Sequence, residues 1–162
     1  MTEFEECFRR ERDNIFKYLF SIARDWTLAE ELTQETFYRA YMNWSALRDK
    51  TSARAWLCKI GKNCYLTWSN EQKRRADLSD PDTLVDPNGP EEIILRDEGS
   101  QKALRCLRAL EEPYREVMRL SVFGGVSLKE ISRLFGKSES WARVTFYRAR
   151  QKLSERMRED EV

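Results

Sequence analysis

Residues 126–153, VSLKEISRLFGKSESWARVTFYRARQKL, restrict the possible folds of this chain more than any other stretch. Ser127 can cap a first short helix, with Glu130 three residues later completing a capping box. Gly136 then stands where a left-handed residue commonly ends a helix, and Ser138 can cap a second helix. The spacing of these residues therefore predicts two short helices joined by a tight turn.

The second predicted helix has one apolar face and one basic face. Ala142, Phe146 and Ala149 are four and three residues apart, which places them on the same side of a helix. Arg143 and Arg148 fall on the remaining surface. A tight turn before such a helix is typical of a helix-turn-helix that enters the major groove of DNA. A plain helical hairpin with a solvated basic face has the same outline, but the caps, the glycine and the arginines together favour DNA binding.

The net charge of +1 hides a division of the chain into blocks of opposite sign. Residues 51–76 hold 6 basic and 1 acidic side chain, and residues 101–162 hold 14 and 9, a net charge of +5 in each block. Residues 77–100 hold 1 basic and 8 acidic side chains, a net charge of −7. This distribution suggests two surfaces that face a polyanion, joined by a segment that DNA repels.

The first half of the chain shows the apolar periodicity of helices. Over residues 4–24, and again from Ala53, apolar side chains recur at helical spacing. Between these stretches, Thr27 and Glu30 form a second capping box, which predicts a helix running to about Trp44.

Residues 77–92, DLSDPDTLVDPNGPEE, interrupt this helical pattern. They contain three of the four prolines and most of the acidic block, without apolar periodicity, which predicts a flexible linker. We therefore predict an all-α fold with two small helical domains, residues 1–76 and 93–162, joined by this flexible acidic linker. The C-terminal domain is the one that holds the predicted helix-turn-helix.

Several classes of protein are disfavoured by what the sequence lacks. Its 162 residues include no His, which removes Ser-His-Asp and Cys-His catalytic arrangements, and no phosphate-binding Gly-rich motif. Its four Cys form no C-x-x-C pair, so structural zinc is not expected. No apolar run reaches the length of a membrane-spanning helix, and the charged N-terminus is unlike a signal peptide. We expect a cytoplasmic protein that is not an enzyme, with no cofactor, no metal and no membrane insertion of its own.

A second candidate surface for nucleic acid lies near the middle of the chain. Asn63 and Trp68 precede the basic run Lys73-Arg74-Arg75. Aromatic rings stack on unpaired bases, amides hydrogen-bond to base edges, and cations hold phosphates. The combination suits single-stranded nucleic acid, with Trp68 as the candidate stacking residue and Trp56 expected in the core.

Four stretches, in chain order, carry a resemblance to a known family. They are AEELTQETFYRAY (29–41), ARAWLCKIGKN (53–63), LRALEEPYREVMRL (107–120) and SLKEISRLFGKSES…RARQKL (127–153). With the two helical domains and the acidic linker, they resemble a bacterial RNA polymerase sigma factor of the extracytoplasmic-function (ECF) group. The resemblance implies binding to core RNA polymerase, recognition of promoter DNA as a −35 duplex and a melted −10 element, and an anti-sigma factor as a further partner.

The resemblance also implies which residues form each surface. Those that bind core polymerase are Glu31, Gln34, Glu35 and Phe37. Those that bind −10 DNA are Lys62, Asn63, Trp68 and Arg74. Those that bind −35 DNA are Ser127, Lys129, Ser138, Ser140, Arg143, Val144, Tyr147 and Arg148. By chemistry alone the acidic stripe at 31–35 would be ordinary solvated surface, so its role as an interface depends on the resemblance.

The predicted recognition helix departs from the common pattern of the family. It opens with Ser140-Trp141-Ala142 where many members have Gly-Thr-Val, and Val144 stands within a run that is often basic. Val144 cannot donate a hydrogen bond to a base and offers only apolar contact, for instance to a thymine methyl group. The usual −35 sequence of the family is therefore not expected here, and the bulky Trp141 can brace the hairpin instead.

Two other classes of protein remain open on the sequence. A stand-alone helix-turn-helix regulator acting as a homodimer would explain residues 101–162 and would bind duplex DNA without polymerase. A protein-binding helical adaptor would explain the amphipathic helices, but it leaves both basic blocks unexplained and predicts no salt-sensitive DNA affinity.

Overall fold

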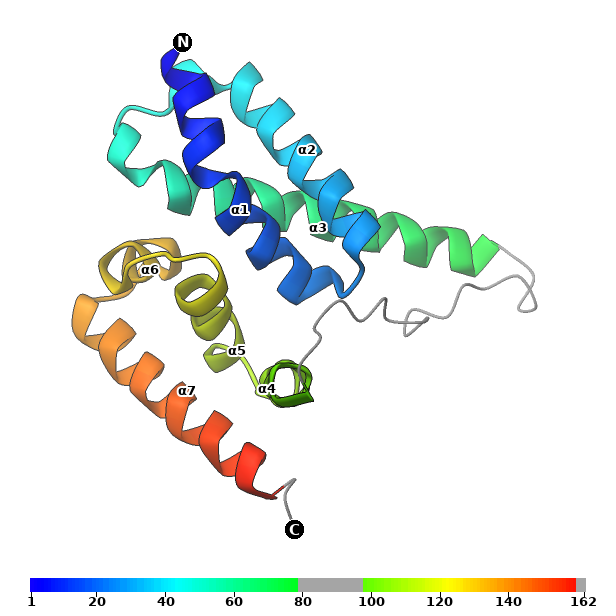
Figure 1. The fold of residues 1–162 in the computed structure, drawn as a ribbon, viewed down its shortest axis with the longest axis vertical. Coiled ribbons are helices and arrows are strands. Elements are labelled where there is room, and N and C mark those ends of the chain that lie inside the picture. Colours follow the sequence, from blue (N-terminus) through cyan, green and yellow to red (C-terminus); the bar gives the residue numbers. More distant parts are fainter. Residues whose placement is uncertain (79–97, 160–162) are drawn as a thin grey trace.

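The computed structural model describes residues 1–78 and 98–159, and every regular element within them is helical. The elements are α1 (Glu3–Ala23), α2 (Trp26–Met42), the 3-10 turns η1 (Trp44–Ala46) and η2 (Lys50–Ser52), α3 (Ala53–Leu78), α4 (Glu98–Arg108), α5 (Tyr114–Met118), the π-helical turn η4 (Arg119–Phe123), α6 (Leu128–Phe135) and α7 (Glu139–Glu159). Helices α1 to α3 form one body, and α4 to α7 form a second body beside it (Figure 1). The predicted all-α class is confirmed.

The predicted linker begins two residues too early, inside a helix of the structure. Helix α3 continues through the basic run and ends only at Leu78, so Asp77 and Leu78 are helical. The remainder of the predicted linker, and the start of the C-terminal domain predicted from residue 93, lie outside the described residues.

The N-terminal body (α1–α3) is a three-helix core that depends on a close approach of its helices. Ile15 and Leu19 of α1 and Leu57 of α3 are fully buried. A Cβ added to Gly61 would lie 3.2 Å from Leu19 Cδ2 and 3.2 Å from Thr36 Oγ1. Glycine at this position therefore lets α3 pack directly on α1 and α2.

Helix α2 begins two residues earlier than the capping box predicted. Asp25, not Thr27, is its N-cap, and the Asp25 carboxylate accepts a hydrogen bond of 2.9 Å from the backbone N–H of Leu28. Thr27 lies inside the first turn, so the predicted capping box at Thr27 and Glu30 is wrong. Asp and Thr can both cap a helix, and the ionised carboxylate of Asp25 also interacts favourably with the helix dipole.

Asp25→Ala is expected to lower the free energy of unfolding by about 1 kcal/mol, because it removes the only side-chain acceptor seen at the start of α2 within residues 1–78. Thr27→Ala is the matched control and is expected to change it by less than about 0.5 kcal/mol. Urea denaturation followed by circular dichroism measures both. A larger loss for Thr27→Ala than for Asp25→Ala would contradict the observed cap.

The C-terminal body (α4–α7) contains the predicted helix-turn-helix in α6 and α7. Ser127 Oγ accepts from the Glu130 N–H at 3.2 Å, and Ser138 Oγ accepts from the Trp141 N–H at 3.1 Å, so both predicted N-caps are confirmed. Gly136 adopts a φ of 65° at the end of α6, as predicted. Trp141 packs on Phe135 of α6 with ring centroids 5.2 Å apart, which braces the turn between the two helices.

The two bodies pack against each other through a shared buried cluster. Val117 and Leu120 of the C-terminal body belong to the same cluster as Ile15, Leu19 and Leu57 of the N-terminal body. Helix α1 contacts η4 and α3 contacts α6, which brings segments far apart in the sequence side by side.

Gly124 lies in the turn after η4, where the C-terminal body packs closely on α3. A Cβ added there would lie 3.3 Å from Cys58 Sγ of α3 and 2.8 Å from the Leu120 carbonyl oxygen, a distance that real Cβ atoms essentially never show. The Leu120 carbonyl of the same turn therefore requires a residue without a side chain here, and Cys58 of α3 adds a second tight contact.

Candidate nucleic-acid and protein interfaces

The outer side of α2 presents the acidic stripe predicted from the sequence. Glu31, Gln34 and Glu35 are all exposed, and Arg39 Nε donates to Glu35 Oε1 at 2.8 Å. Tyr38 continues the stripe one turn further, with 62% of its surface exposed. The result is an exposed face with carboxylates at one end and an aromatic ring at the other.

Phe37 does not belong to this face, which corrects the prediction for that residue. Its ring is 4% exposed and packs edge-to-face on Phe8 of α1, with centroids 4.9 Å apart. Tyr38 was not among the predicted residues, although its spacing of three and four residues from Glu35 and Gln34 places it on their side of the helix.

Helix α3 presents a polar and basic surface beyond its buried portion. Its last buried residue is Cys64. Asn63, Thr67, Asn70 and Arg74 follow each other at intervals of four, three and four, and all are exposed. These residues therefore form one continuous face on a single rigid helix.

Trp68 and Lys62 lie away from this face. Trp68 is five residues from Asn63, or about 140° around the helix, and its ring lies 5.9 Å from that of Tyr65. Lys62 turns toward the C-terminal body, where its Nζ is 3.0 Å from Glu116 Oε2. The structure thus brings together Asn63 and Arg74 of the four predicted −10 residues, with Trp68 and Lys62 on other sides of the helix.

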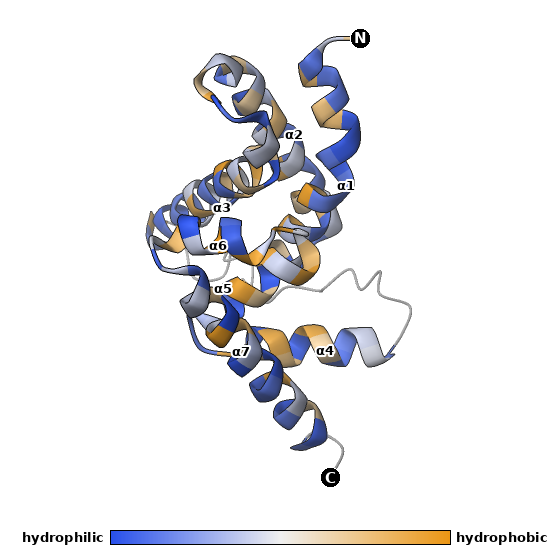
Figure 2. Ribbon diagram, turned by 90° about the vertical axis from the view of Figure 1, so that its left-hand side faces the viewer, coloured by the Kyte–Doolittle hydropathy of each residue, from blue (hydrophilic) through white to orange (hydrophobic). Residues whose placement is uncertain are grey.

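Helix α7 presents most of the predicted −35 residues on its outer surface. Arg143, Val144, Tyr147 and Arg148 are exposed, and Figure 2 shows the helix mostly in the hydrophilic colour. Ala142 and Ala149 on the opposite side are fully buried, as the small-residue pattern predicted. An outward basic surface on a helix braced from behind is a geometry that fits a DNA groove.

Hydrogen bonds within the first turns of α6 and α7 orient several of these side chains. Arg143 Nη2 donates to Ser140 Oγ at 3.3 Å, and its Nη1 lies 3.7 Å from a Glu139 carboxylate oxygen. The hydroxyl oxygens of Ser127 and Ser138 accept cap hydrogen bonds, which leaves each hydroxyl proton available to a phosphate oxygen. Lys129 is exposed beside the Ser127 cap.

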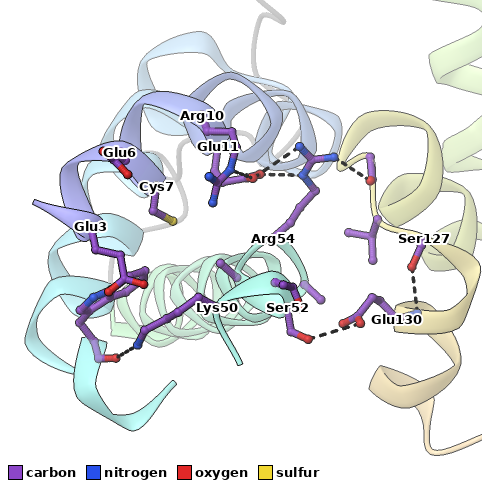
Figure 3. Close-up of a pocket in the computed structure, with 16 residues that line it drawn as sticks. Glu3, Glu6, Cys7, Arg10, Glu11, Lys50, Ser52, Arg54, Ser127 and Glu130 are labelled. Carbon is purple, nitrogen blue, oxygen red and sulfur yellow. Dashed lines mark hydrogen bonds and ion pairs between the residues drawn. The ribbon is translucent and has the colours of Figure 1, made fainter. Parts of the chain in front are cut away.

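A cavity of about 590 Å³ lies where the two bodies meet, between α1, the start of α3 and the turn before α6 (Figure 3). Arg54 points into it from α3, with Nε 2.6 Å from Glu11 Oε2 and Nη1 donating to the Gly125 carbonyl at 3.0 Å. Across the cavity, Ser52 Oγ lies 3.3 Å from Glu130 Oε1. Side chains of the N-terminal body therefore hold the turn that precedes the helix-turn-helix.

A second polar contact between the two bodies is almost fully buried. Glu116 of α5 is 5% exposed, and the Tyr18 hydroxyl of α1 donates to its Oε1. Burial, together with the adjacent Glu116 carboxylate, raises the pKa of Tyr18 well above its usual value, so the phenol stays protonated as the donor. Nothing in the sequence predicted the contact between Tyr18 and Glu116, because a glutamate in a helical pattern is expected at the surface.

The cysteines of the chain lie in the core. Cys7, Cys58, Cys64 and Cys106 are all buried free thiols. Burial raises the pKa of Cys7, Cys58 and Cys64, which keeps these thiols protonated and weakly reactive. In residues 1–78 and 98–159 no cluster of three or more His, Cys, Asp or Glu side chains could hold a metal ion, and no helix has the length and hydrophobicity to cross a membrane.

Comparison with known proteins gives two family matches that cover most of the chain. Residues 7–75 match the family model for sigma-70 region 2, and residues 100–153 match that for sigma-70, region 4. The N-terminal match spans the acidic stripe and most of α3, and the C-terminal match spans the helix-turn-helix.

Individual relatives and solved structures agree with these matches. The chain is 26% identical to the ECF RNA polymerase sigma factor SigM of Bacillus subtilis, over 92% of this chain and 91% of that protein. It is 27% identical to the RNA polymerase sigma factor YlaC of the same organism, over 94% and 91%.

Its fold is similar to the sigma factor RpoE of Bartonella quintana, solved in complex with the anti-sigma factor NepR, with a TM-score of 0.76 and 19% identity over 98% of both chains. It is also similar to CnrH, solved with the cytosolic domain of CnrY, with a TM-score of 0.65 and 21% identity over 97% and 88% of the two chains.

Proposed function

The chain belongs to the sigma-70 family and to its ECF group, and we propose that it binds core RNA polymerase and directs initiation at a specific set of promoters. Members of this family are initiation factors and not enzymes in their own right, and we propose the same for this chain, acting on DNA in the cytoplasm. The observation that carries the proposal is that the region 2 and region 4 matches each contain a helix, α3 or α7, with an exposed polar and basic surface.

Each of the three surfaces is assigned one binding partner. The face of α2 with Glu31, Gln34, Glu35 and Tyr38 would bind core polymerase. Residues 1–76 would also hold melted −10 DNA through α3, with Asn63 and Arg74 on one face and with Lys62 and Trp68 on other sides of the helix. Residues 93–162 would read the −35 duplex, with the outer side of α7 contacting base edges and with Ser127, Lys129 and Ser138 near phosphates.

We also propose an anti-sigma factor as a partner. The support is that RpoE and CnrH, whose folds this chain shares, were each solved with a bound partner, in the case of RpoE an anti-sigma factor. The stand-alone regulator is not favoured, because it leaves the region 2 match on residues 7–75 without a role.

Run-off transcription with purified core polymerase on a mixed genomic promoter library tests the proposal. Discrete transcripts that appear only when the protein is added would support it, and their aligned upstream sequences would give both promoter elements. No new transcript, together with specific duplex binding by a homodimer without polymerase, would contradict the proposal and support the stand-alone regulator.

Reversing a charge on the acidic stripe tests the assignment of the polymerase surface. Glu31→Arg is expected to weaken binding to core polymerase about tenfold, because it places a like charge against the surface that the carboxylate complements. Asp13→Arg, at an exposed carboxylate of α1, is the matched control and is expected to bind like the parent. Equal affinities for both variants, measured by biolayer interferometry with immobilised core enzyme, would contradict the assignment.

A further inference from the structure

Two exposed apolar side chains stand in the middle of the outer face of α7. Val144 is 47% exposed and Tyr147 is 62% exposed. They are three residues apart, so they are neighbours on one side of the helix. Around the helix axis they lie between Arg143 and Arg148, whose directions differ by about 140°. The outer face of α7 therefore has an apolar centre with a basic margin on each side.

The packing of the helix does not account for this apolar centre. The opposite side of α7 carries the packing through Ala142, Thr145 and Ala149, which are all buried. Valine is β-branched and forms helices less readily than the Lys, Arg, Glu and Gln side chains that usually fill exposed helical positions. A polar residue at position 144 would favour the helix more, which points to a contact of Val144 outside the chain.

Contacts on the inner side of α7 fix the direction in which the apolar centre points. Trp141, three residues before Val144, packs on Phe135 of α6 with ring centroids 5.2 Å apart. Ala142 and Ala149 are 0% exposed, which allows α7 to lie directly against the rest of the C-terminal body. A helix fixed on that side presents the same outer residues to any ligand.

An apolar centre with a basic margin is complementary to one feature of duplex DNA. In the major groove, the C5-methyl group of thymine is apolar, whereas the other groups that distinguish the bases are hydrogen-bond donors and acceptors. Valine placed against those polar groups would remove water from them without replacing the lost hydrogen bonds. Residues 101–162 carry 14 basic and 9 acidic side chains, so the ligand of this face is expected to be negatively charged.

We infer that Val144 and Tyr147 form a methyl-reading pair, which selects thymine in the −35 duplex by contact with its C5-methyl group. That a −35 duplex lies on this face rests on the proposed function, whereas the preference for a methyl group rests on the exposed apolar pair. The pair reads a group that takes no part in hydrogen bonding. It therefore adds sequence information that arginine contacts to guanine or to phosphate do not supply.

Replacing thymine with deoxyuridine tests the methyl-reading pair, because it removes the C5-methyl group and keeps every hydrogen-bonding group of the base. The probe is the tightest duplex that the full-length protein with core polymerase selects from a randomised library. Each thymine in the enriched sequence elements is replaced in turn, on either strand, and fluorescence anisotropy measures the affinity. The selection is repeated with the protein alone. Equal selection without polymerase would contradict the proposed function and leave the comparison of thymine with deoxyuridine unaffected.

For the parent protein, deoxyuridine at a thymine that the pair contacts is expected to weaken binding about fourfold, the effect of leaving one methyl group unburied. Val144→Ser is expected to bind the two duplexes equally at that position, because it removes the apolar contact. Tyr147→Phe keeps the aromatic ring and is expected to retain the fourfold ratio, whereas Tyr147→Ser is expected to lower it. Circular dichroism confirms that each variant is folded.

Val122→Ser is the matched control, since Val122 of η4 is 58% exposed and lies outside α7. It is expected to retain the ratio of the parent protein. A ratio of one at every thymine in the parent protein, or a selected probe without thymine in its enriched elements, would overturn the methyl-reading pair. A fourfold ratio that Val144→Ser leaves unchanged would overturn it as well, whatever the dependence of selection on polymerase.

Discussion

Leu57→Ala is expected to lower the free energy of unfolding by about 2–5 kcal/mol, the largest effect among the substitutions considered. Leu57 is 0% exposed and belongs to the buried cluster that both bodies share. Removing its isobutyl group loses the transfer free energy and leaves a cavity that helices fixed by the close approach at Gly61 cannot readily fill.

Leu66→Ala, on the same helix, provides the comparison. Leu66 is 44% exposed, so its truncation is expected to cost less than about 1 kcal/mol. Equilibrium urea denaturation at one protein concentration measures both variants. Similar losses of unfolding free energy for Leu57→Ala and Leu66→Ala would show that α3 does not bury the side of the helix that carries Leu57.

Arg143→Ala is expected to reduce selective transcription by a factor that corresponds to about 1–3 kcal/mol, if the guanidinium makes a bidentate contact with a base. Arg143 stands near the start of α7, exposed, with Ser140 and Glu139 orienting it. The loss is expected to relax selectivity at one promoter position, since a base contact carries sequence information and a phosphate contact does not.

Arg156→Ala removes the same charge near the other end of α7, where the side chain is also exposed. Arg156→Ala is expected to change transcription from all promoters by the same factor and to leave the preference for promoter sequence unchanged. Run-off transcription on a library randomised in the −35 region distinguishes the two. An unchanged promoter profile for Arg143→Ala would refute its assignment as a base-reading residue.

Short-range signals explain what the sequence predicted well. The caps at Ser127 and Ser138 and the left-handed Gly136 each depend on residues within four positions of one another, and each is found in the structure. The small-residue pattern of Ala142 and Ala149 is equally local. Such features depend on backbone hydrogen bonds and helix geometry within one or two turns, so a short stretch of sequence is enough to predict them.

The contacts that depend on distant residues were not predicted. Tyr18 and Glu116 are 98 positions apart, and the pattern around each one is that of an ordinary amphipathic helix. The helical pattern is compatible with a buried Phe37, and only the family resemblance assigned this residue to the polymerase-binding surface. The packing of α1 on α2 places Phe8 against the Phe37 ring and buries it.

The close approach at Gly124 has a consequence for the design of chimeric sigma factors. A Cβ at this position would meet Cys58 Sγ of α3 at 3.3 Å, so the turn at Gly124 is one of the places where the two halves of the chain are closely fitted to each other. A graft that exchanges residues after Gly125 would replace the recognition helix and keep this fit. A graft of an entire foreign region 4 would bring a turn shaped for another partner, and we expect the hybrid to be open in the absence of polymerase. Modular exchange of promoter specificity in this protein therefore has a natural cut point, which lies inside region 4 and not at its border.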